Sequence, residues 1–401
     1  MFAKKMTPQE YWRAGLNMAV AFESPFEFEK EREKSQTPEV NPKEDLYGAY
    51  LRENEPPVAS LVINKKEVRF DGSTVKMGGV GGVATLPAHR RGGAIRACME
   101  LSLRELYSQG YTLSHLYPFS TSYYRQFGFA PASQSVRWRV RLKDLQRLPK
   151  AGGKVRQLFP GDDLSPLLEI YNQAYGEINF SCLREAFDKN LEGDKPLTQK
   201  RWIFLWQDDS GKPGGFLIGS RDKEELFCCP DFSMTNGLLF VHAQALTGLL
   251  HFVWESFLAN FEAIQFSVPA HIDLTCLLPE LSGMDCRPVL NGMARAVNAE
   301  QLLRLCRCRG SGSLAIQVTD NILRENNDIF RLSFAPGQKN TVERVSTPPD
   351  IQMDVGNLAV LLGGARETAT VLMTPGIVVN RDLDQLGQVF YRKPCHILDL
   401  F

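Results

Sequence analysis

The stretch Val80–Arg96, VGGVATLPAHRRGGAIR, decides the fold because it joins an apolar β-type segment to a helix through a basic, glycine-rich loop. The first N–H groups of a helix have no partner within the helix, and the helix dipole is positive at that end, so an anion can bind there. Arginines add charge, and glycines let the main chain approach a phosphate closely. The loop and the first turn of the expected helix contain three arginines and two glycines for these roles: Arg90, Arg91, Arg96, Gly92 and Gly93. We therefore predict a phosphate-binding loop; a plain turn with a solvated basic face is the alternative.

Two nucleotide-binding motifs are excluded by their context. Gly79–Ala84, GVGGVA, fits the dinucleotide pattern GxGxxG/A, but that pattern must open a helix, and Pro87 would break a helix started there. The P-loop pattern GxxxxGK[ST] is absent, because Gly211 and Lys212 are followed by proline.

The segments around the loop predict one α+β unit. A helix is expected over residues 8–21, and residues 48–86 contain β-type segments split by turn residues, typical of antiparallel hairpins. Apolar residues recur with helical spacing over residues 90–109. A short strand, a short helix (STSYYRQF) and a closing strand (GFAPASQSVRWRVRL) follow.

Two further units are expected after the linker at residues 150–154. Residues 237–268 repeat the strand, helix, strand order, but VHAQALTG replaces the basic glycine loop, so this second copy is expected to be degenerate. A third unit starts near Asn291, with GMARAVNAEQLLRLC as its first helix and strands after it. The predicted domains are 1–148, 149–290 and 291–401.

Composition and charge narrow the class of protein. The chain has 401 residues, 43% of them hydrophobic, which predicts several packed cores rather than disorder. Its 46 basic and 46 acidic residues cancel, so no global field attracts nucleic acid or an anionic membrane. We see no signal peptide and no apolar run long enough to span a bilayer, and expect no nucleic-acid or membrane partner.

The cysteines indicate a reducing compartment. There are nine, an odd number, and none forms a CxxC motif, so a cytoplasmic protein without a disulfide framework is expected. Cys306 and Cys308 lack a second pair at the spacing that a zinc site requires, so no metal is predicted.

The loop also carries a family resemblance. Arg90–Ile95 is similar to the Q/R-x-x-G-x-G/A loop of GNAT acyl-CoA N-acyltransferases, with Ile95 where the family prefers Gly or Ala. With LYPFSTSYYRQFGFAPA and the tail CHILDLF, the chain resembles the Eis (enhanced intracellular survival) family of aminoglycoside-type N-acetyltransferases. The resemblance implies tandem GNAT domains, a C-terminal domain similar to sterol carrier protein, acetyl-CoA as co-substrate and a homohexamer.

The resemblance also implies where acetyl-CoA binds. Its pantetheine would pair with a strand edge as if it were another strand, at Val83, Ala84 and Thr85. Its pyrophosphate would bind the loop and first helical turn, at Arg91, Gly92, Gly93, Ala94, Ile95 and Arg96. Phe119 and Ser120 would flank the pantetheine.

Two proton-transfer roles follow from the same resemblance. Tyr124 occupies the tyrosine of the family pattern YxxFGY/F and is expected to protonate the departing thiolate, with Tyr123 as its competitor. An amine is mostly ammonium at neutral pH, so it needs a base before it can attack a thioester. The resemblance assigns that role to the terminal carboxylate of Phe401. Direct attack without a covalent acetyl-enzyme is expected.

The acceptor is less defined than the co-substrate. Phe22, Glu23 and Phe26 belong to an acidic and aromatic stretch that suits a polycationic amine, since carboxylates and aromatic faces both attract cations. The alternative is a solvated connection. By resemblance the acceptor is an aminoglycoside modified at several amines. Acetylation of protein lysines or another endogenous amine, and a lipid-binding module with a vestigial acyltransferase site, stay open.

Overall fold

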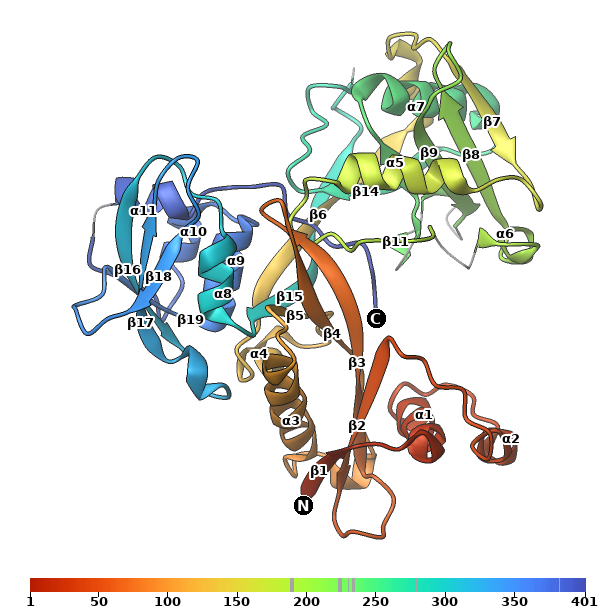
Figure 1. Cartoon of the computed structure of the whole chain (residues 1–401). Helices are drawn as coiled ribbons and strands as arrows, with labels where there is room; N and C mark the ends of the chain where they lie inside the picture. Colours follow the sequence, from red (N-terminus) through yellow and green to blue (C-terminus); the bar gives the residue numbers. More distant parts are fainter. Residues whose placement is uncertain (188–190, 223–225, 230, 233–234, 279, 382) are drawn as a thin grey trace. The chain divides into compact units, whose positions relative to one another are not determined.

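The computed structural model describes residues 1–187, 191–222, 226–229, 231–232, 235–278, 280–381 and 383–401 (Figure 1). They form two compact units. Unit 1 contains residues 1–132, 292–392 and Phe401, and unit 2 contains residues 133–291 and 393–400. The division into three domains predicted above stays a prediction.

The first part of unit 1 contains the helices and strands that the sequence predicts, in the predicted order, and adds a strand at Phe2–Lys5 and a helix at Phe28–Lys34 that were not predicted. The elements are β1 (Phe2–Lys5), a 3-10 turn (Pro8–Glu10), α1 (Tyr11–Ala21), α2 (Phe28–Lys34), β2 (Glu44–Tyr50), β3 (Ala59–Phe70), β4 (Ser73–Thr85), a 3-10 turn (Pro87–His89), α3 (Ala94–Ser108), β5 (Leu113–Leu116) and α4 (Thr121–Arg125). β6 (Ala130–Arg141) then leads into unit 2.

Helix α3 forms because its apolar residues fall on one face. That face is buried in the core of unit 1 together with β-strand side chains, through Ala94, Ile95, Cys98, Met99, Leu103 and Leu106. Gly93, with φ of 82°, supplies the left-handed residue before the helix, and Gly110, with φ of 76°, follows its end. The helix is shorter than the predicted range 90–109 because the loop Arg90–Gly93 is not helical.

The sheet of unit 1 has the strand order β1-β2-β3-β4-β5-β15. β4 and β5 are parallel, and the other neighbours are antiparallel. The last strand, β15 (Asp285–Ala296), returns from unit 2, and its residues 293–296 pair with β5. The predicted helix over residues 292–306 is therefore wrong in its first half, because sheet pairing overrides the helical pattern there.

The C-terminal part of unit 1 is a separate five-stranded sheet with helices. Its strand order is β18-β17-β16-β19-β20. The elements are α8 (Ala299–Leu305), β16 (Gly312–Thr319), a 3-10 turn (Arg324–Asn326), β17 (Asp328–Phe334), β18 (Thr341–Arg344), β19 (Ile351–Asp354), α9 (Val355–Gly363), α10 (Thr368–Leu372), β20 (Val378–Val379) and α11 (Leu383–Val389). α9 is buried along its whole length, as its apolar sequence NLAVLLGG predicts.

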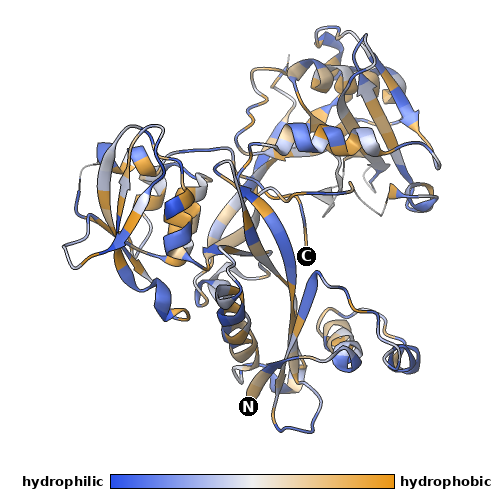
Figure 2. Ribbon diagram, in the orientation of Figure 1, coloured by the Kyte–Doolittle hydropathy of each residue, from blue (hydrophilic) through white to orange (hydrophobic). Residues whose placement is uncertain are grey.

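Unit 2 repeats the architecture of the first sheet. It contains a 3-10 turn (Leu142–Arg147), β7 (Lys154–Leu158), α5 (Ser165–Tyr175), α6 (Lys195–Thr198), β8 (Arg201–Gln207), β9 (Pro213–Arg221), β10 (Phe227–Cys228), β11 (Asp231–Phe232), β12 (Thr235–Asn236), β13 (Leu238–Phe240), α7 (Ala243–Phe257) and β14 (Ala263–Pro269). Its strand order is β7-β8-β9-β10-β14-β6, with β10 and β14 parallel. Figure 2 shows bands of hydrophobic and hydrophilic residues on α5 and α8, typical of helices with one buried face.

The sixth strands of the two sheets are exchanged along the chain. β6 follows the first five strands in sequence but pairs with β14 of unit 2, whereas β15 follows unit 2 but pairs with β5 of unit 1. In the described part of the chain no helix is long and apolar enough to cross a membrane.

Candidate active site

β4 and β5 diverge in the middle of β4. The two strands pair from Met77 opposite Leu113 to Val80 opposite Leu116, where β5 ends while β4 continues to Thr85. A β-bulge at Gly82, with φ of 55°, adds one residue to β4 relative to β3 at the same point. Beyond Val80, β4 pairs only with β3 among the described strands, so one edge of its last five residues is open, as the predicted pantetheine site requires.

The loop before α3 has the geometry of an anion site. Arg91, with φ of 64°, and Gly93 are in the left-handed region. No side chain of the described residues caps the first turn of the helix. No acidic residue lies in that turn. Ala94 and Ile95 bury their side chains in the core, so only their main chain faces the loop. The first-turn N–H groups are thus open to an anionic ligand.

Arg96 has a structural partner in addition to its predicted role. Its Nη2 donates to Oε1 of Gln126 at 2.5 Å, and its guanidinium lies 5.2 Å from the ring centre of Phe127. A weaker ion pair joins it to Glu100, at 3.8 Å. These contacts link the start of α3 to the segment that follows α4.

Tyr124 is buried at the end of the short helix α4. Only 3% of it is exposed, and its ring centre lies 5.2 Å from that of Tyr123 and 5.4 Å from that of Phe119. No described residue forms a hydrogen bond with its hydroxyl. Burial raises the pKa of the Tyr124 hydroxyl, and the neighbouring Tyr123 adds to the rise. The phenol is therefore protonated at neutral pH, as a general acid must be.

The residues predicted to flank the pantetheine lie just before α4. Ser120 caps this helix by accepting from the N–H of Tyr123 at 3.3 Å, and Phe119 is 74% exposed. Tyr123 is half-buried, and burial raises its pKa too.

The C-terminal residue Phe401 lies against the strand face where β4 leaves β5. A Cβ atom on Gly79 would be 2.6 Å from Cδ2 of Phe401, and one on Gly81 would be 2.5 Å from its carboxyl carbon. The ring of Phe401 packs on His115 and Tyr117, at centroid distances of 5.8 and 5.5 Å. The two glycines, excluded above as a dinucleotide motif, make room for the chain terminus. Two glycines at alternate positions of one strand were a signal for this close approach.

His115 has no polar partner for either ring nitrogen within the described residues, although only 1% of it is exposed. Burial lowers its pKa to about 3, so the ring is neutral near pH 7. It therefore adds no positive charge beside Phe401.

The chain before Phe401 is held within unit 2. The N–H of Asn179 donates to the carbonyl of Pro394 at 2.9 Å, and the N–H of His396 donates to the carbonyl of Asn179 at 3.0 Å. Arg184 and Asp399, both almost fully buried, form an ion pair at 3.1 Å. The apolar tail is thus packed rather than frayed, as its sequence predicts.

The predicted acceptor residues lie in the connection between α1 and α2. Phe22 is 59% exposed, Glu23 has a φ of 53°, and Phe26 packs against Gly15 of α1. α1 itself covers β4 near the bulge, where Sδ of Met18 would be 2.7 Å from a Cβ on Gly82. Two other carboxylates of the same stretch form ion pairs on their own helix, Glu27 with Lys30 and Glu29 with Arg32.

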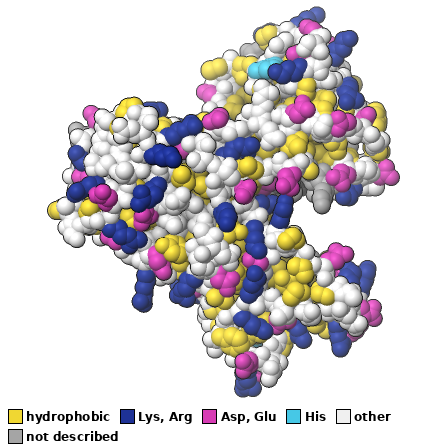
Figure 3. Space-filling model, in the orientation of Figure 1, with side chains coloured by type: hydrophobic (Ala, Val, Ile, Leu, Met, Phe, Trp, Pro, Cys, Tyr) yellow, Lys and Arg dark blue, Asp and Glu magenta, His cyan; other side chains and the backbone are white. Residues whose placement is uncertain are grey.

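Charge on the visible surface is mixed. Figure 3 shows basic and acidic side chains interspersed rather than gathered into one patch of a single sign. Among the described residues no group of three or more His, Cys, Asp or Glu could hold a metal ion.

Comparison with known proteins identifies two domains. Residues 3–132 match the acetyltransferase (GNAT) domain family, and residues 299–396 match the sterol carrier protein domain family. No curated protein matches the sequence.

Solved structures match over the full length. A conserved protein from Enterococcus faecalis, described as a probable N-acyltransferase, has a TM-score of 0.83 and 20% identity, covering 100% of this chain and 99% of its own. A GCN5-related N-acetyltransferase from Anabaena variabilis has a TM-score of 0.79, 19% identity and coverage of 100% and 99%. Eis1 from Mycobacterium abscessus has a TM-score of 0.79, 17% identity and coverage of 100% of both chains.

These matches agree with the expected fold, an acetyltransferase architecture with a C-terminal sterol carrier protein domain. The chain therefore contains an acetyltransferase domain of the GNAT family over residues 3–132, and its full-length fold is similar to that of Eis1.

Proposed function

We propose that the chain transfers the acetyl group of acetyl-CoA to an amine, with Tyr124 as general acid and the Phe401 carboxylate as general base. The observation that carries this proposal is the carboxyl carbon of Phe401, which lies against Gly81 where β4 parts from β5. In this position the carboxylate adjoins the open strand edge that would hold the thioester.

The acetyl-CoA site is built from main-chain groups. Val83, Ala84 and Thr85 offer a strand edge to the amides of the pantetheine. The open N–H groups of the first turn of α3, with Arg91 and Arg96, bind the pyrophosphate, and Phe119 and Ser120 flank the pantetheine.

The reaction balances with three proton transfers, two from the amine nitrogen and one to the thiolate. The Phe401 carboxylate accepts a proton from the ammonium, and the freed amine nitrogen attacks the thioester carbonyl carbon. The carboxylate releases this first proton to solvent. A C–N bond forms and the C–S bond breaks, and the nitrogen, which is cationic after its attack, gives its second proton to the carboxylate, so an amide and a thiolate result. Tyr124 donates its proton to the thiolate and is reprotonated from solvent. No acetyl-enzyme forms.

The acceptor we propose is a polycationic amine such as an aminoglycoside. The exposed ring of Phe22 and the carboxylate of Glu23 lie on the segment that follows α1, the helix that covers β4. An aromatic face and a carboxylate together favour a cation. We further propose that the protein is cytoplasmic. We also propose that it forms a homohexamer, and light scattering of the purified chain would test this oligomeric state.

The test measures thiol release and acetyl gain by mass spectrometry on a panel of amines: an aminoglycoside, a linear polyamine and a lysine peptide. We expect the largest rate with the aminoglycoside. Removing Phe401, or extending the chain by two residues, should lower kcat by about 10²–10⁴-fold while acetyl-CoA still binds. Tyr124→Phe should do the same, and Tyr123→Phe serves as the matched control. An unchanged rate without Phe401 would remove the carboxylate from the mechanism, and a preference for the lysine peptide would overturn the acceptor assignment.

A further inference from the structure

The segment Gln126–Pro131 follows α4 directly and fixes where Tyr124 lies. The N–H groups of Phe127 and Phe129 both donate to the carbonyl of Tyr124, at 3.0 and 3.3 Å. A shift of this segment therefore moves the backbone that carries the Tyr124 ring.

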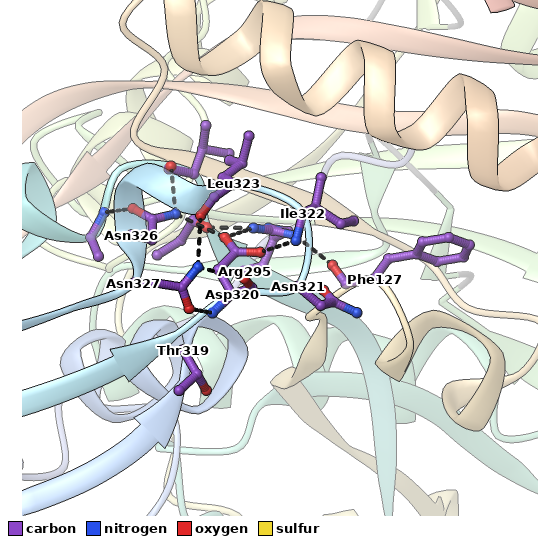
Figure 4. Close-up of polar contacts among 12 residues, drawn as sticks. Phe127, Arg295, Thr319, Asp320, Asn321, Ile322, Leu323, Asn326 and Asn327 are labelled. Carbon is purple, nitrogen blue, oxygen red and sulfur yellow. Dashed lines mark hydrogen bonds and ion pairs between the residues drawn. The ribbon is translucent and has the colours of Figure 1, made fainter. Parts of the chain in front are cut away.

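Side chains of the C-terminal part of unit 1 hold the two carbonyls at the start of this segment. Nη1 of Arg295 donates to the carbonyl of Phe127 at 2.5 Å (Figure 4). Nδ2 of Asn321 donates to the carbonyl of Gln126 at 2.7 Å. Both carbonyls lie just beyond Arg125, the last residue of α4, so these two donors satisfy main-chain groups outside the helix.

Arg295 is itself held by a buried network. It is fully buried and forms an ion pair with Asp320, which also accepts from Nδ2 of Asn326 and from the N–H of Ile322, both at 2.9 Å (Figure 4). A buried ion pair contributes little net stability against apolar residues of the same size, whereas it does fix geometry. The network thereby fixes the guanidinium of Arg295 that donates to the carbonyl of Phe127.

Shape complementarity confines the same segment from another side. A Cβ on Gly128 would be 2.9 Å from Cγ2 of Val355, and one on Gly356, in the first turn of α9, would be 2.5 Å from the carbonyl oxygen of Gly128. Nε of Arg366 donates to the carbonyl of Pro131 at 3.1 Å. The C-terminal part thus contacts the segment at both of its ends and in its middle.

We propose that the sterol carrier protein domain and the strand leading into it position the general acid: Arg295, Asn321 and Gly356 hold the segment after α4 and thereby fix the place of Tyr124. This inference rests on the proposed function, in which Tyr124 protonates the thiolate. It assigns the C-terminal domain a role in acetyl transfer that requires no bound lipid.

The first test crowds the contact without removing a polar group. Gly356→Ala places a Cβ against the carbonyl of Gly128, whereas Gly387→Ala, in the helix α11, places one where no atom lies within 4 Å. We expect Gly356→Ala to lower kcat by about tenfold to a hundredfold, because small misplacements of a catalytic group have effects of that size. The KM for acetyl-CoA should stay within twofold, and Gly387→Ala should match the wild type.

A double-mutant cycle separates positioning from general destabilisation. In the Tyr124→Phe background, Gly356→Ala should have no further effect on kcat, because residues that act as one unit are not additive. Asn321→Ala, a milder surface change, should show the same pattern with a smaller loss, and it serves if Gly356→Ala does not fold. Thermal unfolding of each variant is measured in parallel.

The outcomes distinguish this inference from the proposed function. If Gly356→Ala and Asn321→Ala keep the wild-type kcat, or lose activity equally with and without Tyr124, the positioning role is overturned while the acetyl-transfer mechanism stands. If Tyr124→Phe alone keeps the wild-type rate, the general-acid assignment fails and the inference fails with it.

Discussion

The sheets of the two units differ in whether polar groups at equivalent positions have hydrogen-bond partners. These positions are the first turn of the helix and the parallel pair of strands. In unit 1 the first-turn N–H groups of α3 have no side-chain cap. In unit 2 the corresponding helix α7 begins with His242, whose Nδ1 accepts from the N–H of Ala245 at 3.3 Å. Where β4 and β5 run in parallel, neither ring nitrogen of His115 has a polar partner among the described residues. In the parallel pair β10 and β14, the side-chain N–H of Gln265 contacts Sγ of Cys228 at 3.8 Å.

The difference teaches how a binding site and a packed scaffold diverge from one plan. A polar group that already has a hydrogen-bond partner within the protein does not destabilise the fold, but it is not available to bind a ligand. In unit 2 the N–H of Ala245 has a side-chain cap. Among the described residues β10 is only two residues long, so this strand offers no extended edge like that of β4. In unit 1, where we propose that the ligand binds, the first turn of α3 has no side-chain cap among the described residues.

The change with the largest expected effect fills the space beside the open strand. Gly81→Ala would place a Cβ 2.5 Å from the carboxyl carbon of Phe401 and so displace it. Since a general base contributes about 10²–10⁴-fold, kcat should fall within that range while calorimetry still detects acetyl-CoA. Gly387→Ala is again the control. A Gly81→Ala enzyme with normal kcat would separate the terminus from catalysis.

The anion site should respond through affinity rather than turnover. Arg91→Ala removes one exposed guanidinium from the loop, and a charge-assisted hydrogen bond is worth about 1.5–3 kcal/mol. Calorimetry should therefore show acetyl-CoA affinity lowered by roughly tenfold to a hundredfold. Arg52→Ala, on an exposed turn of the same unit, should leave the affinity unchanged. Equal losses in both variants would indicate a general charge effect instead of a defined site.

Because the ring of His115 is buried and has no polar partner among the described residues, we predict that acid lowers the free energy of unfolding through this residue. The equivalent contact of unit 2, between Gln265 and Cys228, should not contribute to this effect. The pKa of His115 is lowered to about 3 in the folded state, so below about pH 6.5 the unfolded chain binds a proton that the native state does not. The free energy of unfolding should therefore fall by about 1.4 kcal/mol per pH unit from this group as pH falls from about 6.5 toward 3.

Urea unfolding at pH 7.5 and 4.5 measures this slope. His115→Phe keeps an aromatic ring beside Phe401 and should lose less stability between the two pH values than the wild type does. Gln265→Leu, at the equivalent contact of unit 2, should leave the pH dependence unchanged. Parallel behaviour of wild type and His115→Phe would show that His115 is not the sensitive group.

The change with the smallest expected effect tests whether the side-chain cap alone explains why we expect acetyl-CoA to bind at α3 and not at α7. His242→Gly removes the side-chain cap of α7, which should lower the free energy of unfolding by roughly 1 kcal/mol or less. We expect no acetyl-CoA binding at unit 2, because VHAQALTG lacks the arginines of the first loop. Binding in an Arg91→Ala and His242→Gly double variant, above that of Arg91→Ala, would contradict this.

Much of the fold could be predicted from the sequence, because local patterns specify it. The helical spacing of apolar residues predicted α3, and the turn residues predicted the hairpins of β2 to β4. The return of β15 to β5 could not be read from local pattern, since residues 293–296 look helical and their pairing partners lie about 180 residues away.

The candidate site was predicted unevenly for the same reason. The loop Arg90–Arg96 and the residue Tyr124 belong to contiguous motifs, so the sequence shows them. The space that Gly79 and Gly81 leave for Phe401 depends on a contact between distant segments. The network around Arg295 is equally non-local, as its bonds reach Phe127 and Asp320.

The exchange of β6 and β15 has a consequence for how the protein is made. Leu113–Leu116 cannot gain its antiparallel neighbour until residue 296 has been synthesised, so the acetyltransferase sheet stays incomplete while residues 133–291 of unit 2 emerge from the ribosome. Contacts of such long sequence separation slow folding and leave a strand edge exposed to aggregation. A fragment ending near residue 148 would carry that edge permanently, although it contains the whole matched GNAT domain.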